Sequence, residues 1–252
     1  MDRMLNSALI TAAREAGVAL KKVRNGDLYQ KTRDIRRDIL AVAKRADSQI
    51  AQFGDETSRS DKRIVICPVD SESNFKQEYL GAYAVMIGYF EGGIPTFSVV
   101  YLPAEDILIN ATKGAGTQID GRRITVPKTG SIKSQLIGGL FDSLITHDLR
   151  ADQNLALVGS KMVELAVRET GGFRISGSIG IDVLLCLRGQ LGGLVSPYLE
   201  PERRAVFLPL MEAGMKVTDF EGGVISINSA GVIASSREIH QILVKMAERA
   251  GI

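Results

Sequence analysis

The feature that most constrains the fold is a series of short β-branched and aromatic segments between residues 82 and 127. Four of these segments read AYAVMIGYF, IPTFSVVYLP, DILINATKG and RRITVP. Glycine-containing turns separate them at residues 91–93, 113–116 and 120–121. Short strand-like segments joined by such turns are typical of antiparallel hairpins. This part of the chain therefore predicts an antiparallel sheet.

Helical patterns precede this sheet, and an alternation of strands and helices follows it. Apolar residues recur at helical spacing from residue 4 to about 23, and again from 35 to 50. After about residue 131, strand-like segments such as QLIGGLFD and LGGLVSP alternate with helix-like segments such as GIDVLLCLRG and ERRAVFLPLMEAG. The sequence predicts an α+β protein in two parts. Residues 1–130 would form a helix pair and an antiparallel sheet, and residues 131–252 an alternating α/β half.

Composition excludes several classes of protein. The chain has 252 residues, with 31 Lys and Arg against 29 Asp and Glu, so no broad field attracts nucleic acid or a membrane surface. No apolar run reaches the roughly 18 residues that a membrane span needs. Two cysteines, Cys67 and Cys186, are too few for a disulfide framework. These observations predict a cytoplasmic protein that binds neither nucleic acid nor membrane.

The segment IVICPVDSESNF, residues 64–75, leaves an apolar strand through a polar turn. Asp70 stands where the strand ends, and hydroxyl, carboxyl and amide side chains follow it. A functional interpretation makes this a catalytic strand end. A structural interpretation makes it an Asx-type turn that caps a helix, with Cys67 as a small buried apolar residue.

Five separated segments together resemble the inositol monophosphatase superfamily, including its archaeal fructose-1,6-bisphosphatase-like members. They are FGDETS, ICPVDSESNF, KGAGTQIDGRRITV, RISGSIGIDVLLCLRGQL and PERRAVFLPLMEAGM. The resemblance extends from about Gly26 to Gly223. It implies a layered α-β-α-β-α sugar-phosphatase fold and a homodimer. It also implies Mg²⁺-dependent hydrolysis of small phosphorylated sugars or polyols, such as inositol phosphates and fructose 1,6-bisphosphate.

The resemblance also assigns roles to residues of the metal site. Asp55 and Glu56 match the acidic turn of the family, and Asp70 matches the second aspartate of the strand end. These three would be catalytic. Asp55 and Asp70, with Glu202 farther along the chain, would bind the metal, because Mg²⁺ prefers hard oxygen ligands.

The phosphate and substrate positions are matched less well. Ser71 and Glu72 replace the Gly-Thr pair that cradles the phosphate, whereas Gly177 and Ser178 match the pair that lines the sugar pocket. An ionised Glu72 pointing inward would repel a phosphate by roughly 4 kcal/mol, at about 4 Å and an effective dielectric constant of about 20. The carboxylate that binds a substrate hydroxyl in the family falls at Ser196.

Two metal positions also depart from the family pattern. Cys67 stands where the family has its metal-bridging aspartate, and a protonated thiol is a poor magnesium ligand. Counting back from Glu212 puts Glu202 at the last metal aspartate, whereas counting forward from Gly189 puts Arg203 there. The tryptophan that precedes this aspartate in the family is absent under both counts.

Three functional hypotheses remain open at this point. The first is a metal-dependent phosphomonoesterase with impaired activity, since its carboxylates are relocated and not simply deleted. The second is a catalytically silent member of the family that acts as a binding or interaction protein. The third is a zinc site around Cys67, which is disfavoured because the matching segments supply one thiol and no histidine.

Overall fold

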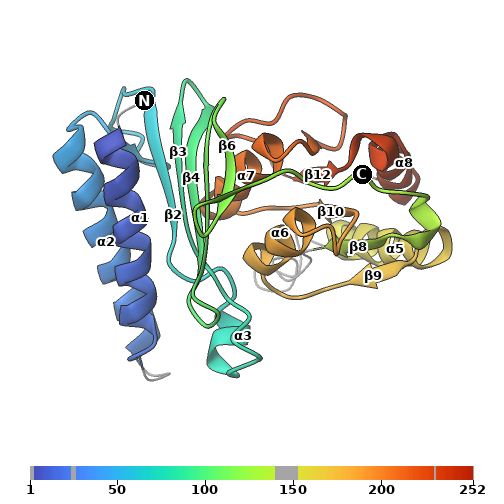
Figure 1. The fold of residues 1–252 in the computed structure, drawn as a ribbon, viewed down its shortest axis with the longest axis horizontal. Coiled ribbons are helices and arrows are strands. Elements are labelled where there is room, and N and C mark those ends of the chain that lie inside the picture. The colour runs from blue at the N-terminus through green and yellow to red at the C-terminus, as the bar shows by residue number, and fades with distance from the viewer. Residues whose placement is uncertain (1–2, 24–26, 140–152, 230, 252) are drawn as a thin grey trace.

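The computed structural model describes residues 3–23, 27–139, 153–229 and 231–251. Within these residues the chain forms five layers, which Figure 1 shows in order from left to right. A helix pair covers one face of a large sheet, short helices pack on its other face, and a smaller sheet lies beyond them. Two further helices cover the far side of the smaller sheet. The α+β prediction is confirmed, whereas the division at residue 130 stays a prediction.

The first layer is the helix pair α1 (Arg3–Leu20) and α2 (Leu28–Ala46). Their apolar faces pack on the large sheet, because every third or fourth side chain points toward it. The described strands of this sheet lie in the order of the sequence, and only the first pair is parallel. They are β1 (Ala51–Gln52), β2 (Lys62–Cys67), β3 (Val85–Glu91), β4 (Ile94–Leu102), β5 (Ile107–Thr112), β6 (Gly116–Ile119) and β7 (Arg122–Ile124).

The β2 strand is buried on both of its faces. Ile64 and Ile66 point to the helix pair, whereas Val65 and Cys67 point to the other side of the sheet. This alternation follows from the two-residue period of a strand. It places Cys67 on the same side as the second half of the chain.

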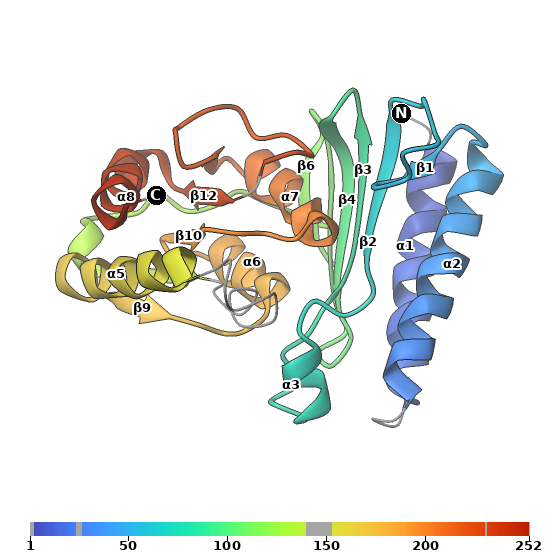
Figure 2. The same cartoon turned by 180° about the vertical axis from the view of Figure 1, so that it is seen from behind.

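The second half contains a mixed sheet whose described strands lie in the order β11-β12-β10-β8-β9. They are β8 (Leu136–Gly139), β9 (Gly172–Arg174), β10 (Gly193–Ser196), β11 (Lys216–Thr218) and β12 (Val232–Ser235). The β8 strand is parallel to β9 and to β10, as the alternating pattern predicts. The outer helices α5 (Gln153–Glu169) and α8 (Arg237–Ala250) cover this sheet on the side away from β2, as Figure 2 shows from behind.

Within the described residues, five shorter elements lie between the two sheets or near their ends. The α6 helix (Ile179–Leu187) and α7 (Phe207–Glu212) pack in the layer between the sheets, together with the 3₁₀ helix η3 (Pro201–Val206). Another 3₁₀ turn, η2 (Ile132–Ser134), precedes β8. The short α3 helix (Glu72–Lys76) projects at one end of the large sheet.

Gly88 explains how η3 lies so close to the large sheet. A Cβ atom built on Gly88 would lie 2.9 Å from the Cα atom of Ala205 in η3 and 2.8 Å from a methyl group of Val65. Real Cβ atoms essentially never come this close to such atoms. The missing side chain therefore lets η3 rest against β2 and β3, and this packing brings residues 200–203 beside the end of β2.

The described helices include none that is both long and apolar enough to cross a membrane.

Candidate functional site

A cleft of about 830 Å³ lies beside the end of β2. Its walls come from the end of β1, from β2, from α3 and from the segment that enters η3. The lining combines apolar side chains, among them Phe53, Val69 and Tyr198, with charged side chains. The charged lining residues are Glu72, Lys76, Glu200, Glu202 and Arg203.

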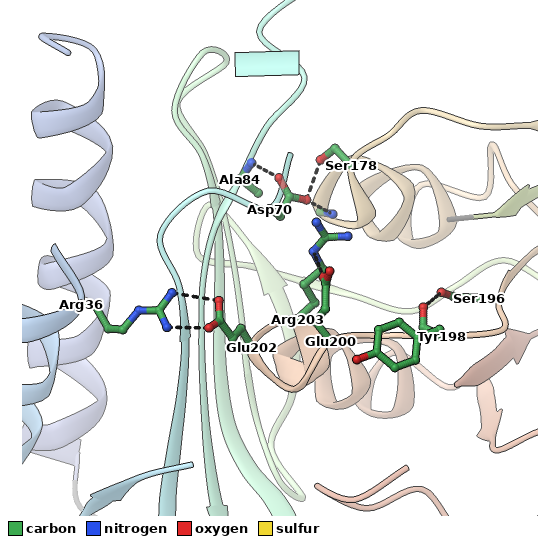
Figure 3. A network of polar contacts seen from close by, with 10 residues as sticks. Arg36, Asp70, Ala84, Ser178, Ser196, Tyr198, Glu200, Glu202 and Arg203 are labelled. Carbon is green, nitrogen blue, oxygen red and sulfur yellow. Dashed lines mark hydrogen bonds and ion pairs between the residues drawn. The ribbon is translucent and has the colours of Figure 1, made fainter. Parts of the chain in front are cut away.

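Asp70 lies three residues after the end of β2, and its side chain is fully buried. One carboxylate oxygen, Oδ1, accepts a hydrogen bond from the amide of Ala84 at 2.6 Å. The other, Oδ2, accepts hydrogen bonds from the Ser178 hydroxyl at 2.7 Å and from the Gly180 amide at 2.9 Å. Figure 3 shows the carboxylate between the strand and the first turn of α6. Asp70 therefore joins the two halves of the chain.

Burial governs the protonation of the two residues that match the strand-end aspartates. It raises the pKa of Asp70, against the opposing effect of its three hydrogen bonds and of the positive charge on Arg203. Burial also raises the pKa of the Cys67 thiol well above its ordinary value, and the charge of Asp70 adds to this rise. Cys67 is therefore a neutral thiol at physiological pH and a poor ligand for a hard cation.

Gly177 and Ser178 form the turn that starts α6. Ser178 is the N-cap of the helix, and its hydroxyl oxygen accepts a hydrogen bond from the Ile181 amide at 3.3 Å. Gly177 has a φ of +75°, and a Cβ atom there would lie 3.2 Å from the side-chain amide of Asn74. That amide donates hydrogen bonds to the carbonyls of Ala82 and Ser176, at 2.8 and 2.9 Å. The two predicted pocket residues thus lie beside the α3 region.

The residues predicted to cradle a phosphate have other partners. Ser71 is buried and is the N-cap of α3, where its hydroxyl oxygen accepts a hydrogen bond from the Asn74 amide. The Glu72 carboxylate lines the cleft but lies 2.8 Å from the ammonium group of Lys76. Its side chain is 56% exposed. Solvent and Lys76 together weaken the repulsion that an inward, unpaired Glu72 would exert.

Both candidates for the last metal position line the cleft. The Glu202 carboxylate accepts two hydrogen bonds from the guanidinium group of Arg36 on α2, at 2.5 and 2.9 Å. The Nε atom of Arg203 lies 2.8 Å from a carboxylate oxygen of Glu200. Ser196, at the substrate-hydroxyl position, is buried and donates a hydrogen bond to the carbonyl of Tyr198 at 2.6 Å.

Asp55 and Glu56 do not line this cleft. The Asp55 carboxylate accepts hydrogen bonds from the hydroxyl and the amide of Thr57, which lower the pKa of Asp55. It lines a separate, open cavity of about 570 Å³ together with Lys44 and Arg59. Glu56 is exposed. Of the predicted site residues, Glu72 and Glu202 line the cleft, and Asp55 and Glu56 do not. Asp70 and Ser178 are joined to each other by a hydrogen bond behind the cleft lining.

The described residues do not fit a bound Mg²⁺ ion. They contain no group of three or more His, Cys, Asp or Glu side chains placed to hold a metal. Asp70 uses three of the about four lone-pair directions of its carboxylate for protein donors. A guanidinium group, that of Arg203, lies in the cleft wall at one of the two positions predicted for the last metal ligand. The metal set Asp55, Asp70 and Glu202 stays a prediction that these contacts do not support.

Two members of the ion pairs at the cleft were not predicted from the sequence. Arg36 lies in the helical segment RDIRRDIL, which has the pattern of an ordinary solvated helix face. Its partner Glu202 is 166 residues away in the sequence, so no local signal links them. Glu200 had a detectable signal, since it lies three residues before Arg203 at the start of a helical segment.

Comparison with known proteins now identifies the class. Residues 31–251 match the sequence pattern of the inositol monophosphatase family, and the chain belongs to that family. A Nus factor SuhB from Vibrio cholerae is 28% identical over 98% of this chain and 97% of its own length. A fructose-1,6-bisphosphatase/inositol-1-monophosphatase from Aquifex aeolicus is 25% identical over 79% of this chain and 71% of its own length.

Solved structures show the same fold. The inositol monophosphatase from Anabaena superimposes with a TM-score of 0.82, covering 97% of this chain and 95% of that one at 24% identity. The IMPase of Thermotoga maritima has a TM-score of 0.80, with 100% and 98% coverage and 24% identity. The predicted layered sugar-phosphatase fold is confirmed.

Proposed function

We propose that this chain is a catalytically silent member of the inositol monophosphatase family, whose cleft works by binding and does not need a divalent ion. The observation that carries this proposal is the environment of Asp70. Its fully buried carboxylate accepts hydrogen bonds from Ala84, Ser178 and Gly180, and so holds α6 to the end of β2. A carboxylate that already accepts three hydrogen bonds from the protein is a structural link and a poor metal ligand.

The charges of the cleft support the same function. Each lining carboxylate has a cationic partner on the protein: Glu72 has Lys76, Glu200 has Arg203, and Glu202 has Arg36. A site for two-metal phosphate hydrolysis needs several carboxylates that remain available to ions. Here the three ion pairs already neutralise these carboxylates. Such a cleft binds neither a cluster of Mg²⁺ ions nor a phosphate dianion well.

The name of one relative supports a role in binding other proteins. The relative from Vibrio cholerae that matches nearly the whole chain is named as a Nus factor, and not by an enzymatic activity. We therefore place this chain among the members that act through partners, as a cytoplasmic homodimer. The runner-up is the impaired phosphatase, which hydrolyses a small phosphorylated sugar or polyol with Mg²⁺. The relatives that are named as phosphatases favour that alternative.

A phosphatase assay separates the two functions. Phosphate release from inositol 1-phosphate, fructose 1,6-bisphosphate and an aryl phosphate is measured with Mg²⁺ or Mn²⁺, with and without EDTA. The Aquifex aeolicus relative serves as the positive control. We expect no EDTA-sensitive turnover from the folded protein.

Metal-dependent turnover would overturn the proposal, provided that it belongs to this chain. The Glu202→Gln variant provides that check, because Glu202 is the only one of the three predicted metal ligands that lines the cleft. Turnover that disappears in this variant establishes the impaired phosphatase. Turnover that persists unchanged points to a contaminating enzyme, which a repeat after further purification removes.

A further inference from the structure

The wall of the cleft contains a cation, the Arg203 guanidinium, at one of the two positions that the family pattern predicts for its last metal-binding aspartate. We propose that this guanidinium takes the place of the divalent ion that the family binds, and that it keeps divalent metals out of the cleft. This inference rests on the proposed function, because both require a cleft without a bound divalent ion. Arg203 would be the residue that excludes the ion, through the repulsion between two positive charges.

Contacts fix the place of the guanidinium group. Its Nε atom lies 2.8 Å from the Glu200 carboxylate, and both side chains line the cleft with Cys67. In Figure 3 the far end of the Arg203 side chain points from η3 toward Asp70 and the start of α6. Arg203 thus lies between a carboxylate of the second half and the strand-end position of the first half.

Electrostatics agree with this placement. Cys67 lines the cleft together with Arg203, and Figure 3 shows the Arg203 guanidinium directed toward Asp70. Cys67 and Asp70 match the two strand-end aspartates that hold metal in the family. A single cation that acts on both of them, and that is paired with Glu200, stands among the groups that a divalent ion would neutralise.

The local backbone explains why Arg203 is held there. Pro201 starts η3, and the amide of Arg203 donates a hydrogen bond to the carbonyl of Glu200 at 2.9 Å. Glu200 is the N-cap of η3, and its carboxylate pairs with the side chain of Arg203 three residues further into the turn. The next residue, Arg204, is buried and donates a hydrogen bond to the carbonyl of Ile227. The turn is therefore anchored on both sides of Arg203.

An ion pair exposed to solvent would repel a metal ion only weakly, whereas a buried pair would repel it strongly. The exposure of Arg203 and Glu200 therefore decides whether Arg203 can exclude a metal. The Arg203 and Glu200 side chains are only 12% and 22% exposed. Those of Arg249 and Glu169, an ordinary pair on the outer helices, are 54% and 34% exposed. Water screens the buried charge of Arg203 less, so a divalent ion placed beside it meets a stronger repulsion.

Direct measurement of Mn²⁺ binding tests the proposal. Isothermal titration calorimetry and the electron paramagnetic resonance signal of free Mn²⁺ are recorded for the wild type, Arg203→Gln, Arg203→Ala and Arg203→Lys. The Arg249→Ala variant is the matched control, because it also removes an arginine from a glutamate. Gln retains a donor for Glu200 without the charge, and Lys retains the charge. Thermal unfolding confirms that each variant is folded.

We expect the wild type, Arg203→Lys and Arg249→Ala to bind Mn²⁺ only in the millimolar range or more weakly. Arg203→Gln and Arg203→Ala should bind it at least tenfold more tightly, and Mn²⁺ should raise their melting temperatures. Equal affinity in Arg203→Gln and Arg249→Ala overturns the proposal, and so does tight binding by the wild type. If neither neutral variant folds, the wild-type titration with micromolar Mn²⁺ still decides.

The proposed function has its own readout, so the two failures are distinguishable. Metal-dependent turnover by the wild type contradicts the silent cleft. An absence of gain in Arg203→Gln, together with an absence of turnover, contradicts only the role of Arg203.

Discussion

The hydroxyl group of Ser178 donates a hydrogen bond to the buried carboxylate of Asp70 at 2.7 Å, across 108 positions of the sequence. Ser178 is the N-cap of α6, and Asp70 follows β2, so this contact connects the two halves of the molecule. The amide of Gly180 in the first turn of α6 reinforces it. The carboxylate therefore also complements the positive N-terminal end of the helix.

Replacing Asp70 by Asn should destabilise the protein strongly. The Asn side chain has one acceptor oxygen, so its NH₂ group would face a donor, either the Ala84 amide or the pair on α6. We expect the free energy of unfolding to fall by about 2–4 kcal/mol in urea denaturation. The exposed Glu56→Gln variant should change it by less than about 0.5 kcal/mol. Equal stability of the two variants would show that Asp70 is not a structural link.

The sequence predicted well where the signal is local. The hairpins of the large sheet follow from glycine turns between β-branched segments, and β3, β4, β5 and β7 form as expected, whereas β6 lies between two of the predicted turns. The end of β2 and the start of α6 carry Asp70 and Ser178, and the resemblance selected both residues. It selected them as a ligand and a pocket residue, however, and their mutual hydrogen bond depends on packing that no single segment encodes.

The helical segment before β11 differs from its prediction in another way. ERRAVFLPLMEAG was expected to be one helix, but it forms η3 followed by α7, which begins at Phe207. Pro209 explains the break, because proline lacks an amide hydrogen and is tolerated only in the first turn of an α-helix. Starting α7 at Phe207 puts Pro209 in that first turn. The resulting 3₁₀ turn carries Glu202 and Arg203 into the cleft.

Two glycine variants should distinguish the stability lost to backbone strain from the stability lost to crowding beside the N-terminus of α6. Gly54 and Gly177 both have left-handed backbones, with φ of +88° and +75°. A Cβ atom on Gly54 would meet nothing within 4 Å, whereas on Gly177 it would press on the Asn74 amide. We expect Gly54→Ala to cost about 1 kcal/mol of stability and Gly177→Ala about 2 kcal/mol. Equal losses in urea denaturation would show that Asn74 moves aside without cost.

His240 should make stability depend on pH. Its buried ring contacts the hydroxyl groups of Thr218 and Ser235 at 3.0 and 3.1 Å. Burial, assisted by the charge of Lys216, lowers the pKa of His240 to about 4. The folded protein therefore favours the neutral ring, while the unfolded chain binds a proton below about pH 6.5.

Stability should accordingly be lost as the pH falls from about 6.5 to about 4. Between pH 7 and 4.5 we expect the wild type to lose about 2 kcal/mol more than His240→Gln, by urea denaturation at each pH. The variant lacks the titrating ring and shares every other group, so it is the control. Parallel pH profiles for the two proteins would exclude this contribution of His240.

Rebuilding the metal site should require three changes. Cys67→Asp restores a hard oxygen ligand on the buried face of β2, and Glu72→Thr removes a carboxylate from the predicted phosphate cradle. With Arg203 still beside them, we expect this double variant to bind Mn²⁺ only weakly. Adding Arg203→Asp replaces the cation by a further ligand and should tighten binding at least tenfold in calorimetry.

The control for the triple variant is Cys67→Ser with Glu72→Thr and Arg203→Asp, which has the same changes around a position without a carboxylate. If it binds Mn²⁺ as tightly as the aspartate version, position 67 is not a ligand. If the triple variant gains nothing over the double variant, the charge at position 203 does not exclude the ion. In either result the protein would fail to bind the metal for another reason. The reason that remains is that three protein donors already bind the Asp70 carboxylate.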